Sequence, residues 1–280
     1  GYRTFSMALH DGLSHFLLSV AIRWTMLVRR LKKKEPGLIK DAEGLEEQIN
    51  QAISLTRNIS SGLFPLTLNS MNLKEIMEQK KKLLEEIEEK TKAAELPLKG
   101  TATNLVFGKG NPDAEIIFVG EAPGQQEDLR GKPFVGAAGK VLDKFLSSIG
   151  LTENDIYIAN ILKYRPPNNR EPTIEEIRSH TPFLIEQIKT IEPKVIVTLG
   201  NYATKFILAN CRPEEMETIQ GMTAVHGKVN IIEIAGKRFK VIPTYHPAAL
   251  MYNRALSPKA EADFKIIKAE VSQKNLGNFN

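Results

Sequence analysis

Gly120-Glu121-Ala122-Pro123-Gly124 is the stretch that decides the fold, because it directly follows the apolar run Ile116 to Val119 and precedes a polar segment. Glycines at the end of a strand let the backbone approach a ligand closely. An equally simple interpretation of these five residues is a tight turn between a strand and a helix, followed by a solvated acidic face. These five residues alone do not distinguish a ligand site from a turn, so the other motifs of the sequence are needed.

Apolar runs like the one before Gly120 recur along the chain and predict buried strands. The expected strands are Ile116 to Val119, Ile156 to Ile158, Val195 to Leu199 and Val241 to Pro243, and the expected helices are Ala137 to Ile149, Thr173 to Ile191 and Tyr202 to Leu208. This alternation predicts an α/β fold, with a central parallel sheet and helices on both faces. Because such sheets bind ligands at the carboxyl ends of their strands, we expect residues 120–124, Asn160 and His246 at one edge.

The first 78 residues have a different pattern, which is helical. Two apolar stripes recur at spacings of three and four residues, on either side of Pro36-Gly37: Leu9, Leu13, Phe16, Val20, Trp24, Leu27 and Leu31, then Leu45, Ile49, Ala52 and Ile59. They predict an all-α helical hairpin that pairs with a second copy as a dimeric four-helix bundle. A charged helix from Leu73 to Lys92 then leads into the second domain, and we place the two domains at residues 1–78 and 79–280.

Charge, cysteine content and the length of the apolar runs indicate which partners and which cellular compartment to expect. The 280 residues carry a net charge of +5, which favours polyanionic partners such as nucleic acids. The single cysteine, Cys211, excludes an intramolecular disulfide and an all-cysteine metal site, and it suits a reducing cytoplasm. The apolar runs are too short for a membrane span, so we expect a cytoplasmic protein without a membrane partner.

Further motifs follow the first one in order. They are Gly131-Lys132-Pro133-Phe134-Val135-Gly136, Asn160-Ile161-Leu162-Lys163, the segment Arg-Pro-Pro-Asn-Asn-Arg-Glu-Pro at 165–172, and Thr244-Tyr245-His246-Pro247-Ala248-Ala249-Leu250. Together with the first stretch they resemble the motifs of family 4 uracil-DNA glycosylases, over nearly all of residues 83–272. The resemblance implies the three-layer uracil-DNA glycosylase fold and a monofunctional enzyme that flips uracil out of DNA and hydrolyses its N-glycosidic bond. Its partner would be uracil-containing DNA.

The resemblance also assigns the residues that would bind the base. Phe134 would stack on uracil, and the Asn160 amide would read the O4 and N3 edge of the ring. The backbone around Gly120, Ala122 and Gly124 would line the same site. Ordinary structural roles stay open for two of these residues, namely core packing for Phe134 and a strand-end cap for Asn160.

His246 is the residue expected to stabilise the transition state. As the bond breaks, negative charge moves onto uracil O2, where a histidine donor would act; ordinary packing is its alternative role. Activation of water is left open between Glu121 and Glu127, because Ala122 stands where family 1 enzymes have an aspartate. Gly124 likewise stands where family 1 enzymes have a tyrosine that excludes thymine.

Other residues are expected to contact DNA outside the base site. The candidate phosphate contacts, on a loop that is otherwise a solvated basic segment, are Lys163, Arg165, Asn169 and Arg170. Leu250 and Met251 follow His246 on the same predicted loop. They are expected either to enter the base stack as an apolar wedge or to pack in the core.

One departure from family 4 concerns its cofactor. Members usually bind a four-iron, four-sulfur cluster through four cysteines. Aligned through the neighbouring motifs, the four positions in this chain are Ala93, Leu96, Tyr164 and His180. Alanine and leucine cannot ligate iron and one histidine cannot hold a cluster, so we predict no iron–sulfur cluster, no metal site and no other cofactor.

A second resemblance concerns the first 70 residues. Ala8-Leu9-His10-Asp11-Gly12-Leu13-Ser14 and, after the hairpin, Leu63-Phe64-Pro65-Leu66-Thr67-Leu68 are similar to the dimerisation and phosphoacceptor region of sensor histidine kinases. The resemblance implies a homodimer through residues 1–70, with His10 at the phosphoacceptor position. No ATP-binding pattern follows residue 78, so His10 has no phosphoryl source within the chain and is expected to be structural. Either an engineered fusion, with repair sequence from near Met71, or a natural fusion would explain the combination.

Two other functions stay open at this point. One is a catalytically weak DNA-binding or scaffold protein of the same fold, favoured by the missing cluster and by Tyr252 at the altered arginine position of the last motif. The other is a phosphotransfer or dimerisation module. The presence of Glu121, Phe134, Asn160 and His246 argues against the first, and the missing ATP-binding half argues against the second.

Overall fold

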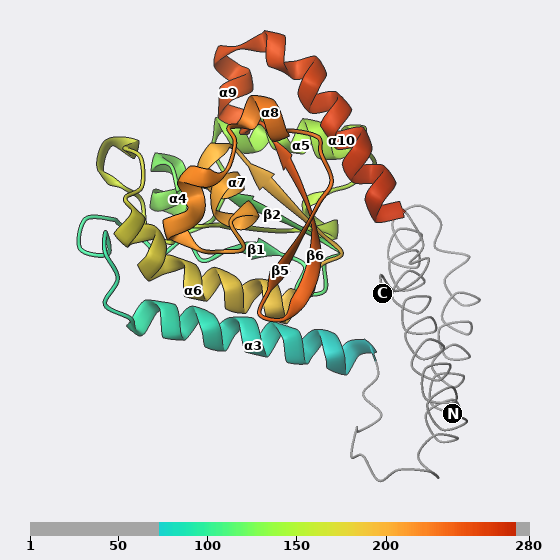
Figure 1. Cartoon of the computed structure of the whole chain (residues 1–280). Helices are drawn as coiled ribbons and strands as arrows, with labels where there is room; N and C mark the ends of the chain where they lie inside the picture. The colour runs from blue at the N-terminus through green and yellow to red at the C-terminus, as the bar shows by residue number, and fades with distance from the viewer. Residues whose placement is uncertain (1–72, 273–280) are drawn as a thin grey trace, which may run out of the picture. The chain divides into compact units, whose positions relative to one another are not determined.

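A mixed sheet of six strands lies at the centre of the computed structural model, which describes residues 73–272 (Figure 1). In spatial order its strands are β1 (Lys109–Gly110), β3 (Tyr157–Asn160), β2 (Ile116–Gly120), β4 (Val195–Leu199), β6 (Lys237–Thr244) and β5 (Asn230–Ile234). The chain passes from β2 to β3 on one side and then returns to β4 on the other. Strand order therefore reverses at β2, whose carboxyl end is the expected place for a ligand in such sheets.

Several predictions concern residues that the structure does not describe. The helical hairpin, its homodimer through residues 1–70 and His10 all lie outside residues 73–272. They stay predictions, and so does the domain boundary between residues 78 and 79.

The four inner strands run parallel, whereas β1 and β5 at the two edges are antiparallel to their neighbours. The predicted parallel centre is therefore confirmed, but the sequence did not indicate the antiparallel edges. β5 is joined to β6 through Ala235 and Gly236, whose φ angles of 50° and 80° are both positive. Two positive φ angles in succession are what a two-residue hairpin turn requires.

Helices cover both faces of the sheet. One face carries α3 (Leu73–Ala93), α6 (Ile174–Ile191) and α7 (Asn201–Leu208), and the other carries α5 (Ala137–Ser148) and α10 (Ser257–Ser272). The shorter helices are α4 (Gln125–Arg130), α8 (Met222–Val225) and α9 (Pro247–Tyr252), with 3-10 turns η2 (Glu153–Asp155), η3 (Pro167–Asn169), η4 (Pro213–Thr218) and η5 (Arg254–Leu256). The four predicted helices that fall in the described residues are confirmed to within one residue at each end.

The inner strands are apolar because they are buried on both faces. In β2, Ile117 and Val119 pack in the layer of α6 and α7, whereas Ile116 and Phe118 pack in the layer of α5 and α10. Fully burying one such side chain stabilises the fold by about 1.5–3 kcal/mol. The alternation explains why the strands are continuous apolar runs and holds β2 firmly between two helical layers.

The helix α3 is fastened to this body at its middle. Leu84 and Ile87 are buried in the core on the α6 side. The Lys80 ammonium donates to Asp113 Oδ1 at 2.6 Å and to the Ile191 carbonyl at 2.9 Å. Figure 1 shows α3 running alongside α6, in keeping with these contacts.

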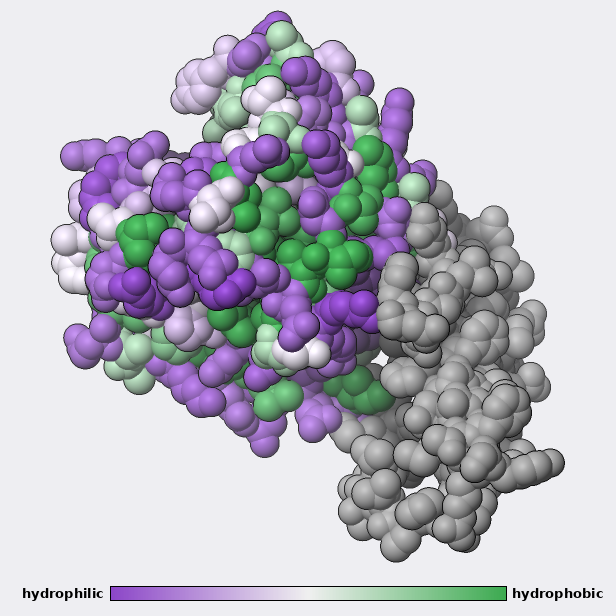
Figure 2. All heavy atoms as spheres, viewed as in Figure 1, coloured by the Kyte–Doolittle hydropathy of each residue, from purple (hydrophilic) through white to green (hydrophobic). Residues whose placement is uncertain are grey.

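Polar residues cover most of the face seen in Figure 2, and apolar residues gather near its middle, where β5 and β6 lie in Figure 1. Val229 and Ile231, which are 42% and 50% exposed, belong to this edge of the sheet. Among the helices of residues 73–272, none is both long and apolar enough to cross a membrane.

The first turn of α5 contains a glycine that the fold requires. A Cβ on Gly139 would lie 2.1 Å from the Phe134 carbonyl oxygen, far inside the van der Waals distance. We expect Gly139→Ala to lower the free energy of unfolding by about 3 kcal/mol, although alanine normally favours a helix. Denaturant unfolding measures the change. Gly221→Ala is the control, because φ is −68° there and a Cβ meets nothing within 4 Å; equal stability losses in the two variants would contradict this packing.

Candidate active site

The parallel register of β2 and β3 brings the first two site residues together. Gly120 pairs with Asn160, and each is the last residue of its strand. A Cβ on Gly120 would lie 2.3 Å from Asn160 Oδ1 and 3.1 Å from Phe134 Cε2. The absence of a side chain at this position is therefore what lets the amide and the ring approach the strand end. The structure brings these three predicted residues together.

The amide of Asn160 is buried and incompletely bonded. Asn160 is 2% exposed, and its Oδ1 is a buried oxygen that accepts no hydrogen bond within the described residues. A buried acceptor without a partner costs about 1–3 kcal/mol. Such a group is expected where a ligand donor completes the hydrogen bonding. The predicted strand-end cap does not account for this oxygen.

Phe134 is held in a left-handed backbone conformation beside this amide. Its φ is +50° and it is 7% exposed. The loop that follows it is fastened by Glu127, whose Oε1 accepts from the backbone N–H of Val135 at 2.9 Å and of Gly136 at 2.8 Å. A Cβ on Gly124 would lie 2.7 Å from the other carboxylate oxygen of Glu127. Glu127 therefore holds the backbone that follows Phe134, and its carboxylate lies against Gly124.

His246 reaches the same place from the end of β6. It caps the first turn of α9, where its Nδ1 accepts from the Ala248 N–H at 3.2 Å. With Nδ1 as the acceptor, the proton of the neutral ring is on Nε2. Burial of the ring lowers the pKa of His246 to about 4, against a smaller opposing effect of Glu127. The centroids of the His246 and Phe134 rings are 5.6 Å apart. The structure therefore provides a neutral imidazole donor beside the aromatic side chain.

Glu121 directly follows β2 and is only partly exposed. Burial, with a smaller contribution from the charge of Glu171, raises the pKa of Glu121 to about 7. Its backbone carbonyl accepts from the Leu162 N–H at 3.0 Å, which ties it to the segment after Asn160. A carboxyl group that titrates near neutral pH is suited to exchanging protons with water. Ala122, the next residue, packs against the core cluster on the α6 side.

Burial contradicts the predicted phosphate contact of Lys163 and, for Leu250, favours the alternative of core packing over a wedge. Lys163 is 0% exposed, and its ammonium bonds only inside the protein, so it does not reach a phosphate. Leu250 is 6% exposed and packs with Tyr245 and Ala260, so it is not a wedge. Leu250 packs inward because residues 247–252 form the helix α9 and not the predicted loop.

The neighbouring residues of α9 face solvent instead. Met251 is 45% exposed and Tyr252 is 90% exposed. On the basic loop, Arg165 donates through Nε to Asn169 Oδ1 at 2.8 Å in an exposed pair. These four side chains lie where they can meet a large ligand. The sequence marks Tyr252 only as the altered arginine position of the last motif.

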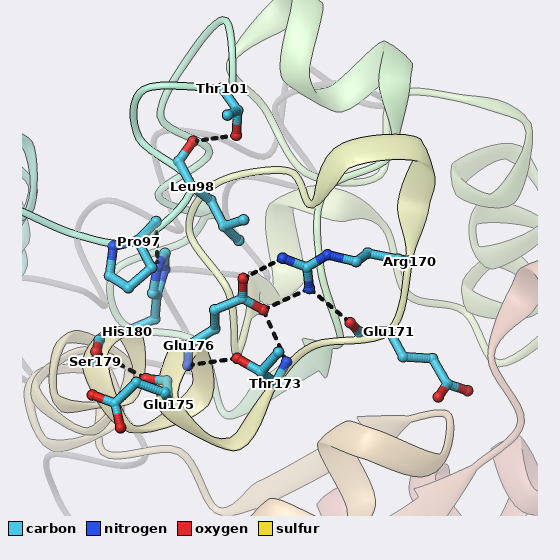
Figure 3. A network of polar contacts seen from close by, with 10 residues as sticks. All are labelled: Pro97, Leu98, Thr101, Arg170, Glu171, Thr173, Glu175, Glu176, Ser179 and His180. Atoms are coloured by element: carbon cyan, nitrogen blue, oxygen red, sulfur yellow. Dashed lines mark hydrogen bonds and ion pairs between the residues drawn. The ribbon is translucent and has the colours of Figure 1, made fainter.

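Arg170 has a structural partner (Figure 3). Its two terminal nitrogens donate to the two carboxylate oxygens of Glu176 at 2.9 and 2.5 Å, and one also donates to the Glu171 carbonyl. Glu176 in turn accepts from the Thr173 N–H at 2.8 Å, in the capping box that begins α6. A bidentate arginine–carboxylate pair of this kind fixes the loop before α6. We therefore leave Arg170 out of the phosphate contacts.

The residues at the four cluster positions do not fit an iron–sulfur cluster. Neither Ala93 nor Leu96 has a ligating atom, and Tyr164 packs edge-on against the ring of His180 at 6.1 Å. Both ring nitrogens of His180 are already used, because Nδ1 accepts from the Lys163 N–H and Nε2 donates to the Pro97 carbonyl, each at 2.9 Å. No thiolate is present at any of the positions.

Comparison with known proteins adds to this geometry. Residues 107–271 match the family model of the uracil DNA glycosylase superfamily. The chain belongs to the uracil-DNA glycosylase superfamily. A type-4 uracil-DNA glycosylase from Archaeoglobus fulgidus is 53% identical over 167 residues, which are 60% of this chain and 82% of the relative. Two more type-4 uracil-DNA glycosylases are similar: that of Saccharolobus solfataricus is 45% identical over 179 residues (63% and 81%), and that of Thermotoga maritima is 43% identical over 180 residues (64% and 88%).

Two glycines that shape this glycosylase site were not singled out by the sequence. Gly139 leaves room for the Phe134 carbonyl, and a Cβ on Gly200 would lie 3.0 Å from the Cβ of His246. Gly200 also has a φ of +88°, which favours glycine. A glycine within a helical pattern and a glycine directly after a strand are the available signals for such close approaches.

The titration of Glu121 tests the electrostatics of the glycosylase site. We expect the carboxyl carbon of Glu121, followed by NMR, to titrate near pH 7, well above an ordinary glutamate. Replacing Glu171 by Gln removes a negative neighbour and should move this titration toward lower pH by a fraction of a unit, since burial, the larger cause, remains. Glu121→Gln identifies the resonance. Titration of Glu121 below pH 5, or no response to Glu171→Gln, would contradict the assigned causes.

Proposed function

We propose that this domain is a monofunctional uracil-DNA glycosylase, which hydrolyses the bond between uracil and deoxyribose and leaves an abasic site. Superfamily membership and similarity to type-4 uracil-DNA glycosylases support the activity. The main support from the structure is the Oδ1 of Asn160, which has no hydrogen-bond partner within the described residues. It lies close to the Phe134 ring at the end of β2, and that ring contacts His246. An aromatic face, a free acceptor and a neutral donor are the groups that a uracil ring needs.

Base recognition rests on Phe134 and Asn160. The flipped uracil lies against the Phe134 ring, and its N3–H donates to Asn160 Oδ1. This hydrogen bond satisfies the buried acceptor. Cytosine has no proton on N3, so it would leave Asn160 Oδ1 unpaired in the same pose and would be rejected.

Bond cleavage rests on His246. The electron pair of the C1′–N1 bond moves onto uracil, and negative charge develops on O2 while the sugar becomes cation-like. The Nε2–H of His246 donates to O2, where this charge appears. Because burial keeps the pKa of His246 near 4, the ring is a neutral donor throughout the physiological range.

The second half of the reaction rests on Glu121. A water molecule adds its oxygen to C1′ and gives a proton to the Glu121 carboxylate, while uracil departs with the electron pair of the broken bond. Glu127 is the less suitable base, because its Oε1 already accepts two backbone hydrogen bonds. The carboxylate form of Glu121 is required, so the rate should fall as the pH decreases through about 7.

DNA engagement rests on exposed residues around the site. Arg165 and Asn169 are proposed to contact phosphates, and the net charge of +5 favours this polyanion. Met251 and Tyr252 are proposed to occupy the gap that the flipped nucleotide leaves in the base stack. The alternative function is a catalytically weak DNA-binding or scaffold protein of the same fold.

The direct test is incubation of an oligonucleotide containing one uracil with the full chain, followed by alkaline cleavage of abasic sites. We expect product from the parent protein, and a rate lower by about 10²-fold in His246→Ala, since one transition-state donor is removed. Asn160→Ala should be similarly impaired. Asn230→Ala is the matched control, because Asn230 is a half-buried asparagine at the start of β5 whose side-chain amide donates to the Lys228 carbonyl at 2.9 Å.

The outcomes separate the two functions. Binding of uracil-containing DNA without any product would contradict the enzyme and favour the scaffold protein. Equal product from the parent and from His246→Ala would leave the enzyme but contradict the role of His246.

The glycosylase is further proposed to need no iron–sulfur cluster or other cofactor. The support is the chemistry of Ala93, Leu96, Tyr164 and His180, which do not form a ligand set. The purified protein should contain no stoichiometric iron and should show no absorption band at about 400 nm, and it should stay active in the presence of a chelator. A brown protein that loses activity with its iron would contradict this proposal.

A further inference from the structure

The lysine of the Asn160-Ile161-Leu162-Lys163 motif is the least expected buried group in the domain. Lys163 is 0% exposed, although its motif lies at the carboxyl end of β3, where the strand leaves the sheet. Its backbone is fixed on both sides, since its N–H donates to His180 Nδ1 and its carbonyl accepts from the Val106 N–H, each at 2.9 Å. The side chain therefore has little freedom to leave the interior.

The ammonium of Lys163 meets three acceptors. It donates to Gln187 Oε1 at 2.6 Å, to the Asn160 carbonyl at 3.0 Å and to the Phe107 carbonyl at 3.3 Å. The Phe107 ring centroid is 5.7 Å away, within the range of a cation–π contact. Three acceptors match the three N–H groups of an ammonium, whereas a neutral amine has only two. The geometry thus fits the charged form, although burial lowers the pKa of Lys163 to about 7.

All three acceptors are neutral, so this ammonium is costly to keep inside the protein. A methionine of similar length would fill the same space without desolvating a charge. What the lysine adds is a link between the carbonyl of Asn160 and the side chain of Gln187 in α6. Gln187 is itself fixed, because its Nε2 donates to the Phe107 carbonyl at 3.1 Å and to the Tyr157 hydroxyl at 3.2 Å.

We propose that Lys163 is a positioning residue for base recognition, which holds the main chain of Asn160 so that its side-chain amide faces uracil. The inference rests on the proposed function of the same site. The link is short: Lys163 bonds the carbonyl of the residue whose Oδ1 has no partner within the described residues. Loss of the ammonium lets the end of β3 move, and the acceptor for N3–H moves with it.

The test compares Lys163→Met with Lys80→Met in the full chain. Lys80 is a matched control, because it is a partly buried lysine that also bonds a carbonyl of α6, that of Ile191, together with Asp113 before β2. Calorimetry measures the affinity for free uracil and for an oligonucleotide containing an abasic site. The second ligand has no base for Asn160 to read, so it separates base recognition from general damage.

We expect Lys163→Met to weaken uracil binding by about tenfold or more, with abasic-site affinity within about twofold of the parent. Lys80→Met should leave both affinities unchanged. Gln187→Leu, which keeps the lysine, should weaken uracil binding to a smaller extent, and its effect should not add to that of Lys163→Met, because both act through one network. If Lys163→Met does not fold, Gln187→Leu carries the same comparison.

Unchanged uracil affinity in the folded variants, or equal losses for uracil and for abasic-site DNA, would overturn the positioning role. This failure is distinguishable from failure of the proposed function. A parent chain that binds free uracil but releases none from DNA contradicts the glycosylase activity alone, whereas an active parent with an unaffected Lys163→Met variant contradicts the role of Lys163 alone.

Discussion

The parallel pairing of β2 with β3 is the constraint on which the rest of the structure depends. Its register sets Gly120 opposite Asn160, and the two segments stay paired beyond the strands because Ile161 donates to the Gly120 carbonyl and Leu162 to the Glu121 carbonyl. A shift by one residue would turn every side chain of a strand to the opposite face of the sheet. Backbone hydrogen bonds thus bring the amide proposed to read the base and the carboxyl group proposed to accept a proton from water to one edge of the sheet.

Small residues and burial then determine what the site can do. Gly120 leaves room for the amide and the aromatic ring, and Gly200 leaves room for His246. Burial keeps His246 neutral and raises the pKa of Glu121 to about 7, so that one group donates without a charge and the other exchanges a proton near neutrality. An unpartnered buried acceptor lowers the stability of the free protein, and this cost is typical of a site prepared for a ligand.

The sequence predicts those parts whose signal is local. β4 coincides with its apolar run, because a strand buried on both faces needs little else, and the strand-end rule brings the base-site residues together. β5 was missed because one of its faces is exposed and its turn, Ala235-Gly236, lacks the usual asparagine or aspartate. Lys163 was misassigned, and the role of Leu250 stayed undecided, because a motif does not reveal burial: one acceptor of Lys163 is Gln187, which is 24 residues away.

Uracil is proposed to complete the hydrogen bonding at this edge of the sheet, and a crystal structure of the full chain with bound uracil is the direct test. We expect the uracil ring against Phe134, with N3–H donating to Asn160 Oδ1 and O2 within hydrogen-bond distance of His246 Nε2. Uracil bound elsewhere, or bound here with Asn160 Oδ1 still lacking a donor, would contradict this role of the strand edge.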